Sequence, residues 1–92
     1  MTNEVAQKII KFYNNREDRW RQRILAADKH GNPVLLENHK QAVSFCPIGV
    51  AFKLLDDCDI IVQEWQDFMD KFDARFNDSH SFQEVINCLS LL

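Results

Sequence analysis

The sequence predicts a mainly helical α+β fold, with four to five short helices and one small β-hairpin in a single domain over residues 1–92. Three observations predict it. Apolar residues recur at helical spacing in three separate segments. Hydrophobic residues make up 46% of the chain, which is enough for one compact core at this length. The chain has only two glycines and two prolines and no internal repeat, which leaves little room for a linker between domains.

The first helix is expected close to the N-terminus. Its apolar residues recur every three or four positions, at Val5, Ile9, Phe12 and Tyr13. Thr2 or Asn3 can cap its start, because a short polar side chain accepts a hydrogen bond from a backbone amide of the first turn. Asn14 and Asn15 mark its expected end.

Residues 19–28 fit either a helix or a strand. In a helix, one face carries Trp20, Ile24 and Ala27. In a strand, two sets of side chains alternate, with Trp20, Gln22, Ile24 and Ala26 on one side and Arg21, Arg23 and Leu25 on the other. The turn-forming residues 30–33 and the short β-favouring run 34–36 follow, and they favour the strand. We therefore expect a hairpin from about Trp20 to Leu36.

Two short helices are expected in the middle of the chain. Asn38 can cap a helical stretch that continues through Phe45. Pro47 fits the first turn of a second helix, because an amide hydrogen would be unpaired there in any case, and this helix should end near Leu55. Residues 56–59 break the helix, and the aspartate that closes this segment can cap the next one.

The clearest helix of the chain follows. Its apolar residues fall within an arc of roughly 120° on a helical projection, which is the width of a core-facing stripe. The stripe contains Ile61, Val62, Trp65, Phe68, Met69, Phe72 and Phe76. We expect this stripe to form the centre of the core, and residues 77–78 to turn the chain out of the helix.

The last helix has its own start signal. Ser81 and Glu84 form a capping box, in which each side chain accepts a hydrogen bond from the backbone of the other residue. The apolar residues of this helix are Phe82, Val85, Ile86, Leu89 and Leu92.

Charge is divided unevenly along the chain. Residues 1–55 carry nine Lys and Arg against five Asp and Glu, whereas residues 56–92 carry two against nine. A body with opposite charges at its two ends can steer a charged partner or associate with copies of itself. The charge division therefore favours a protein partner and is compatible with a homodimer.

An acidic row follows the strongest predicted helix. It consists of Glu64, Asp67, Asp70 and Asp73, each three positions after the last. Asp is a mediocre helix former, so helix propensity does not explain these residues. One interpretation is a surface that docks on a basic partner, and the other is a solvated face that keeps a small apolar domain soluble.

A basic segment surrounds Trp20, with arginines at Arg16, Arg19, Arg21 and Arg23. Basic side chains beside an aromatic ring can hold a phosphate backbone while a base stacks. Glu17 and Asp18 dilute the segment, and the chain is acidic with a pI near 5.5, which disfavours nucleic acid as the partner. On a strand, Arg19, Arg21 and Arg23 would share one face, so we group them with the acidic row as candidate partner-binding residues.

Cys46 carries a separate chemical hypothesis. It precedes Pro47 at a predicted helix start, where the helix dipole favours a thiolate. With His39 or His80 nearby, it would act as a nucleophile. The other interpretation is a cysteine packed beneath Trp20. No oxyanion-hole sequence is visible, so we expect no enzyme.

Other kinds of site lack their sequence patterns. The three cysteines and three histidines contain no Cys-x-x-Cys or His-x-x-x-His spacing, so no metal site is expected. Gly31 and Gly49 are too far apart for a phosphate-binding loop, and no cofactor is expected. The apolar runs are too short for a membrane span, and the first residues do not resemble a signal peptide. Three widely spaced cysteines fit free thiols, mostly buried, so a cytoplasmic location is expected.

A set of residues spread over the chain forms a pattern. It comprises Trp20, Gly31, Ala42, Phe45-Cys46, Gly49, Asn77-Asp78 and Glu84-Val85. The pattern resembles a family of small bacterial and phage proteins with a domain of unknown function, and it covers Trp20–Leu92. The chain departs from that family at Pro47-Ile48 and at Val50. The family has no assigned activity, so the resemblance implies no catalytic residues, although its phage members bring inhibition of a host protein into consideration.

These observations favour a small non-enzymatic protein-interaction module. It would be an adaptor, regulator or inhibitor that binds a protein partner through charged surface, with the acidic row favoured. A nucleic-acid-associated regulator that uses the Arg16–Arg23 segment is the first alternative. A small thiol-dependent enzyme that uses Cys46 is the second.

Overall fold

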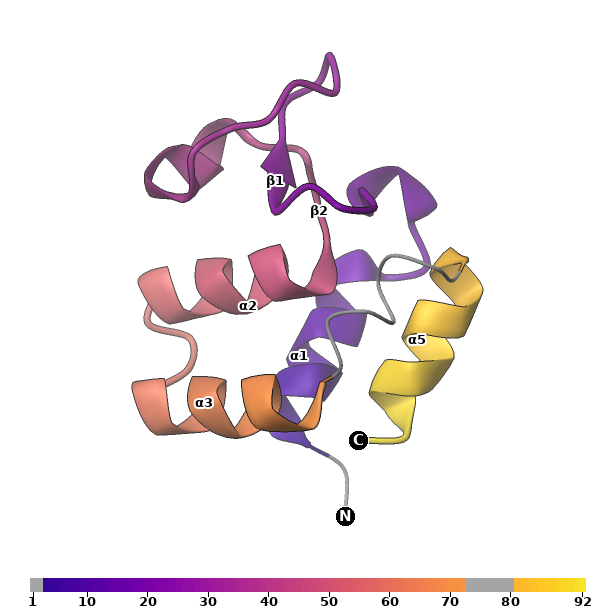
Figure 1. Cartoon of the computed structure of the whole chain (residues 1–92), viewed down its shortest axis with the longest axis vertical. Helices are drawn as coiled ribbons and strands as arrows, with labels where there is room; N and C mark the ends of the chain where they lie inside the picture. The colour runs from indigo at the N-terminus through magenta and orange to yellow at the C-terminus, as the bar shows by residue number, and fades with distance from the viewer. Residues whose placement is uncertain (1–2, 73–80) are drawn as a thin grey trace.

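The structure is a computed structural model and describes residues 3–72 and 81–92. Within these residues it has four α-helices, two 3₁₀-helices (η1 and η2) and one two-stranded antiparallel sheet, which confirms the predicted fold class. The elements are α1 (Glu4–Tyr13), η1 (Glu17–Arg19), β1 (Ala26–Ala27), η2 (Leu36–Gln41), β2 (Ser44–Phe45), α2 (Pro47–Asp56), α3 (Val62–Lys71) and α5 (Phe82–Ser90). Figure 1 shows α2 and α3 running in opposite directions one above the other, with the sheet beyond α2.

Helix α1 lies at the centre of the domain and packs against α2, α3 and α5. Its buried residues are Val5, Ala6, Ile9 and Tyr13. Of the two predicted caps, Asn3 is the one that caps its start, because the side-chain oxygen accepts a hydrogen bond from the Ala6 amide at 3.0 Å. Asn14 ends it in the left-handed conformation, which asparagine adopts more readily than most residues. The sequence therefore locates both ends of this helix correctly.

The sheet differs in part from the predicted hairpin. The turn lies where it was predicted, since the Val34 amide donates to the Ala26 carbonyl at 2.9 Å. The strand that pairs with β1, however, is β2 and not the run 34–36. Pro33 lies opposite Ala27 in an isolated bridge, and proline has no amide hydrogen with which to extend a ladder there. Residues 19–25 form no strand.

The helical stretch predicted from Asn38 through Phe45 is also wrong in part. The 3₁₀-helix η2 begins at Leu36, and Asn38 lies inside it with a non-helical backbone instead of capping it. Ser44 and Phe45 do not continue the helix, because they pair with β1. Pairing between distant segments thus overrides the local helix signal.

Helix α2 begins at Pro47, as predicted, and ends one residue beyond the predicted end. Cys46 is its N-cap, and the Sγ atom accepts a hydrogen bond from the Gly49 amide at 3.4 Å. Gly49 lets the helix touch the chain just before β1. A Cβ atom at this position would lie 1.7 Å from the Leu25 carbonyl oxygen. The absence of a side chain at residue 49 therefore sets how closely α2 approaches β1.

Helix α3 begins later than predicted. Its N-cap is Ile61, and Glu64 Oε1 accepts a hydrogen bond from the Ile61 amide at 2.9 Å. Asp59 is not the cap, because its amide donates to the Leu54 carbonyl at 2.9 Å and so belongs to the end of α2.

The apolar stripe of α3 contributes to the core but does not form its centre. Phe68 and Phe72 are buried, Trp65 and Met69 are partly buried, and Ile61 and Val62 are 63% and 57% exposed. Phe76 and the predicted turn at 77–78 lie outside the described residues. The central position belongs to α1, because three helices pack around it.

Helix α5 begins with the predicted capping box. Ser81 Oγ accepts a hydrogen bond from the Glu84 amide at 3.3 Å, and Glu84 Oε1 accepts one from the Ser81 amide at 3.2 Å. The helix buries Phe82, Val85 and Leu89. Across residues 3–72 and 81–92, no helix has the length and apolar character needed to cross a membrane.

Candidate functional site

Two members of the acidic row make contacts within the chain. Glu64 is half-buried and caps α3 through its hydrogen bond to the Ile61 amide. Asp67 accepts a hydrogen bond from Asn3 Nδ2 at 3.1 Å and pairs with Lys71 Nζ at 3.3 Å. The contact with Asn3 links the residue before α1 to α3. Together these contacts give Glu64 and Asp67 a structural role that does not require a partner protein.

The rest of the row is exposed or undescribed. Asp70 is exposed, and Asp73 lies outside the described residues. The two engaged members also line a shallow hollow together with Glu4 and Lys71. The single Lys71 ammonium offsets only one of the three carboxylates there, so this hollow is anionic.

The basic segment does not form the predicted single face, because these residues form no strand. Arg19 ends η1, and its Nη1 donates to the Phe12 carbonyl at 2.7 Å while the guanidinium lies 5.8 Å from the centre of the Phe12 ring. The Arg21 guanidinium lies against Gly31, where a Cβ atom would be 2.8 Å from Nη2. Arg23 is exposed and has a left-handed backbone conformation.

Trp20 and Arg16 complete this segment. The Trp20 ring is half-buried and packs on Phe82 at a centroid distance of 5.6 Å. Arg16 pairs with Asp18 at 2.8 Å, and this hydrogen bond lowers the pKa of the Asp18 carboxyl. A nucleic-acid platform needs an exposed ring face beside cations that can reach phosphate. The structure does not bring these two features together.

Cys46 is buried, with 2% of its surface exposed. It lies close to Tyr13, whose hydroxyl donates to the Phe45 carbonyl at 2.7 Å. Burial, with a smaller contribution from Cys46, raises the pKa of Tyr13 well above its usual value. His39 pairs with aspartates at the end of α2, and His80 lies outside the described residues. The geometry matches a packed cysteine more closely than a nucleophile.

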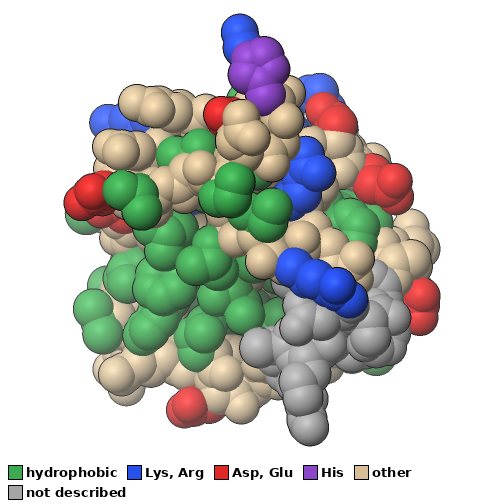
Figure 2. Space-filling model, turned by 45° about the horizontal axis from the view of Figure 1, so that its top comes forward, with side chains coloured by type: hydrophobic (Ala, Val, Ile, Leu, Met, Phe, Trp, Pro, Cys, Tyr) green, Lys and Arg blue, Asp and Glu red, His purple; other side chains and the backbone are tan. Residues whose placement is uncertain are grey.

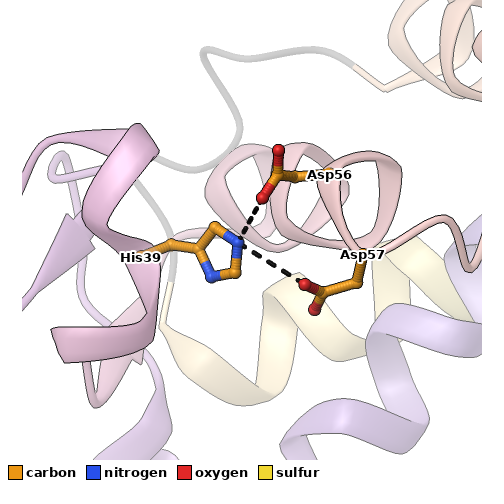
Figure 3. Close-up of side chains that lie close together, drawn as sticks. All are labelled: His39, Asp56 and Asp57. Atoms are coloured by element: carbon orange, nitrogen blue, oxygen red, sulfur yellow. Dashed lines mark hydrogen bonds and ion pairs between the residues drawn. The ribbon is translucent and has the colours of Figure 1, made fainter.

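The structure forms one cluster that the sequence did not indicate. Figure 3 shows His39, on η2, pointing toward Asp56 and Asp57 at the end of α2. His39 Nε2 lies 2.7 Å from Asp56 Oδ2 and 3.5 Å from Asp57 Oδ1, and only 3% of the histidine is exposed. A nitrogen and two carboxylate oxygens so close together form a donor set that suits Zn²⁺. Asp56 follows His39 by 17 positions, so no spacing motif could have identified the cluster.

The surroundings of this cluster favour a structural role. Lys53 Nζ lies 2.7 Å from Asp57 Oδ2, and this hydrogen bond is the main cause of the lowered pKa of Asp57. A metal-bound histidine usually donates its second ring N–H to an acceptor. In the part of the chain that the structure describes, the buried Nδ1 of His39 has no such partner. The cluster therefore acts as a clasp between η2 and α2.

Exposed apolar side chains gather on a different surface. Figure 2 shows hydrophobic side chains collected over one region of the molecule, with acidic side chains at its edge. Two adjoining hollows form it, and both are lined by Leu36, so we call it the Leu36 surface. The first hollow is lined by Leu36, Glu37, Phe52, Leu55, Asp56 and Val62. Residues of the second include Arg23, Leu25, Pro33, Val34, Leu35 and Leu36.

The Leu36 surface exposes large aliphatic side chains. Leu35 is 66% exposed and Val62 is 57% exposed. Phe52 packs on Trp65 at a ring distance of 5.2 Å. The first hollow therefore has a rigid aromatic side between α2 and α3. Val62, predicted as a core residue, belongs to this surface instead.

Charged residues lie in both hollows of the Leu36 surface. Glu37 and Asp56 line the first hollow, and both are exposed. Arg23 lines the second hollow. The first hollow is thus lined by two acidic side chains and the second by one basic side chain. Of the predicted partner-binding residues, only Arg23 lines either hollow within the described part of the chain.

No protein-family model, curated protein or solved structure matches this chain.

Proposed function

We propose that this protein is a small non-enzymatic interaction module that binds a protein partner through the Leu36 surface. The observation that supports the proposal is the concentration of exposed aliphatic side chains around two charged-rimmed hollows. Small proteins that act alone seldom expose such patches, and an apolar patch rimmed by polar residues is typical of a protein-binding site. Covering Leu35 and Val62 would contribute about 2 kcal/mol to binding.

The acidic row has a secondary part in this proposal. A partner that used Glu64 or Asp67 would have to compete with contacts already made to Ile61, Asn3 and Lys71. A basic partner would therefore gain little from these two residues, since exposed ion pairs contribute about 0–1 kcal/mol. We infer that the acidic row assists the approach of a partner and that the Leu36 surface supplies most of the affinity.

We further propose that the protein acts in the cytoplasm as an adaptor, regulator or inhibitor. Support comes from its thiols. Cys58 is a free and exposed thiol and Cys88 is partly exposed, which corrects the expectation that the thiols are mostly buried. An exposed free thiol is most easily maintained in a reducing compartment. Membership of the bacterial and phage family stays a prediction.

Affinity capture followed by titration of the purified partner tests the proposal. Leu35→Glu places a charge in the middle of the Leu36 surface and should weaken binding at least about tenfold, which corresponds to about 1.4 kcal/mol. Leu91→Glu is the matched control, because Leu91 is 86% exposed and lines neither hollow. Equal affinities for the wild type and Leu35→Glu would contradict the proposal. If only the Asp67→Lys, Asp70→Lys double variant loses affinity for the partner, the binding site is the acidic row and not the Leu36 surface.

A further inference from the structure

We propose that His39, Asp56 and Asp57 bind one Zn²⁺ ion, and that this ion strengthens the clasp between η2 and α2. The inference goes beyond the proposed function and does not depend on it. It rests on the distances between the three side chains and on the way in which each of them is held.

The donor atoms have nearly the spacing that a tetrahedral ion requires. Ligand atoms about 2.0–2.2 Å from Zn²⁺ lie roughly 3.3 Å from one another at the tetrahedral angle. His39 Nε2 is 2.7 Å from Asp56 Oδ2 and 3.5 Å from Asp57 Oδ1, and the three donor atoms all lie within 4.8 Å of one another. The Asp56 side chain is 67% exposed and is free to make the small shift that an ion between these atoms needs.

His39 is the fixed member of the site. Its side chain is only 3% exposed, and Figure 3 shows the ring directed toward both carboxylates. The rotamer freedom of this side chain is already lost in the folded chain, so binding an ion does not cost it again. Asp56 also lines the first hollow of the Leu36 surface, from which an ion and its remaining water ligand can enter.

The charges around the cluster favour a cation. Two carboxylates face His39, whereas one ammonium, that of Lys53, pairs with the cluster at 2.7 Å from Asp57 Oδ2. Carboxylates that bind a metal are commonly hydrogen-bonded as well, so Lys53 orients Asp57 through Oδ2 and leaves Oδ1 facing His39. Lys40 is exposed and has the weakest of the effects that lower the pKa of Asp57.

The second ring nitrogen of His39 limits the affinity. Nε2 must coordinate through its lone pair, so in the neutral ring the proton moves from Nε2 to Nδ1. Among the described residues Nδ1 is buried without a hydrogen-bond partner, and the move exchanges an unpaired lone pair for an unpaired N–H. A missing acceptor typically costs roughly 10–100-fold in metal affinity. We therefore expect a site that is weaker than a closed structural zinc site and that exchanges its ion with solution.

Calorimetric titration of the chelator-treated full chain with ZnCl₂ tests the site. One Zn²⁺ ion per chain should bind, whereas MgCl₂ should bind far more weakly, because Mg²⁺ requires octahedral oxygen ligation. With free Zn²⁺ at about a hundredfold excess over the dissociation constant, the melting temperature should rise by about 10 °C. The absence of saturable Zn²⁺ binding up to about 1 mM, or Mg²⁺ binding of equal strength, would overturn the proposal.

His39→Gln and Asp56→Asn identify the ligands, and each should weaken Zn²⁺ binding at least about tenfold. Glutamine can keep a hydrogen bond to Asp56 but offers the ion no ring nitrogen. His30→Gln is the matched control, because His30 is exposed in the turn after β1, and it should leave binding unchanged. Zn²⁺ binding that persists undiminished in His39→Gln would overturn the proposal. If circular dichroism shows that His39→Gln is unfolded, Asp56→Asn decides in the same way.

Cys58 supplies a competing explanation that the same titration excludes. It is an exposed thiol directly after Asp57, and thiolates also bind Zn²⁺. Cys58→Ser should keep the affinity of the wild type. Binding that is lost in Cys58→Ser but kept in Asp56→Asn would assign the ion to the thiol and contradict the site proposed here.

Discussion

Gly49→Ala is the substitution that tests the architecture behind the Leu36 surface most sharply. Gly49 is buried in the first turn of α2, where the helix meets the Leu25 backbone. Because α2 carries Phe52 and Leu55 into the first hollow and Leu25 lines the second, this contact sets the relative position of the two hollows. Adding one methyl group should push them apart.

The magnitude follows from two opposing effects. Alanine is better than glycine in a helix by about 0.5–1 kcal/mol, which favours the variant. Against this, the new Cβ would lie 1.7 Å from the Leu25 oxygen, and real Cβ contacts essentially never fall below 3.0 Å. Overpacking against backbone costs about 1–3 kcal/mol, and the nearby hydrogen bond from the Cys46 amide to the Ile24 carbonyl, now 3.2 Å, would lengthen at a cost of about 1 kcal/mol. The net loss should be about 2 kcal/mol, a large part of the total stability of roughly 5–14 kcal/mol for a chain of this length.

Urea unfolding measures this loss. With a slope of about 1 kcal/mol per molar urea, the midpoint should fall by about 2 M. Gly31→Ala is the control, because Gly31 has φ of +82° but its close neighbour is only the flexible end of Arg21. The free energy of unfolding of Gly31→Ala should fall by about 1 kcal/mol, because alanine is strained in the left-handed conformation. If Gly49→Ala proves as stable as Gly31→Ala or more so, the close approach of α2 to Leu25 is not what positions the hollows.

Three further outcomes are expected. Because burial raises the pKa of Tyr13, the folded state holds the proton of the Tyr13 hydroxyl more tightly than the unfolded state does, and the free energy of unfolding should fall as the pH rises above about 10. In alkaline unfolding curves, Tyr13→Phe should make this fall less steep. Lys53 lowers the pKa of Asp57 from 3.8, so the stability that this pair contributes is present above pH 3.8 and is lost as the pH falls below it. Lys53→Met should therefore make the acid unfolding curve less steep. An unchanged slope would show that the pair does not contribute to stability. Ser81→Ala removes half of the capping box and should cost about 1 kcal/mol in thermal or urea unfolding, while a loss below about 0.3 kcal/mol would show that the box contributes nothing measurable.

Local signals predicted the helices well where one residue sets a boundary. Asn3, Pro47 and Ser81 each stabilise a helix start through their own backbone or side-chain chemistry, and each was located correctly. The region between Trp20 and Phe45 was harder, because β1 pairs with a strand on the far side of η2. No local pattern contains that information.

The candidate site depended even more on distant contacts. The Leu36 surface combines the segments 23–37, 52–56 and residue 62, and only the folded chain brings them together. One indication of exposed apolar side chains near this surface was present in the sequence. Ile61 and Val62 are the first residues of the predicted α3 stripe, and both prove to be more than half exposed, since the helix begins only there. The acidic row was visible, whereas its contacts with Asn3 and Lys71 required the structure.

Hydrogen–deuterium exchange of the free protein and of its bound complex tests the central claim most directly. Binding should slow exchange in residues 34–37 and in the last turn of α2, whichever protein is the occupant. Protection that appears only along α5, or only on the acidic face of α3, would contradict the claim that the Leu36 surface is the binding site.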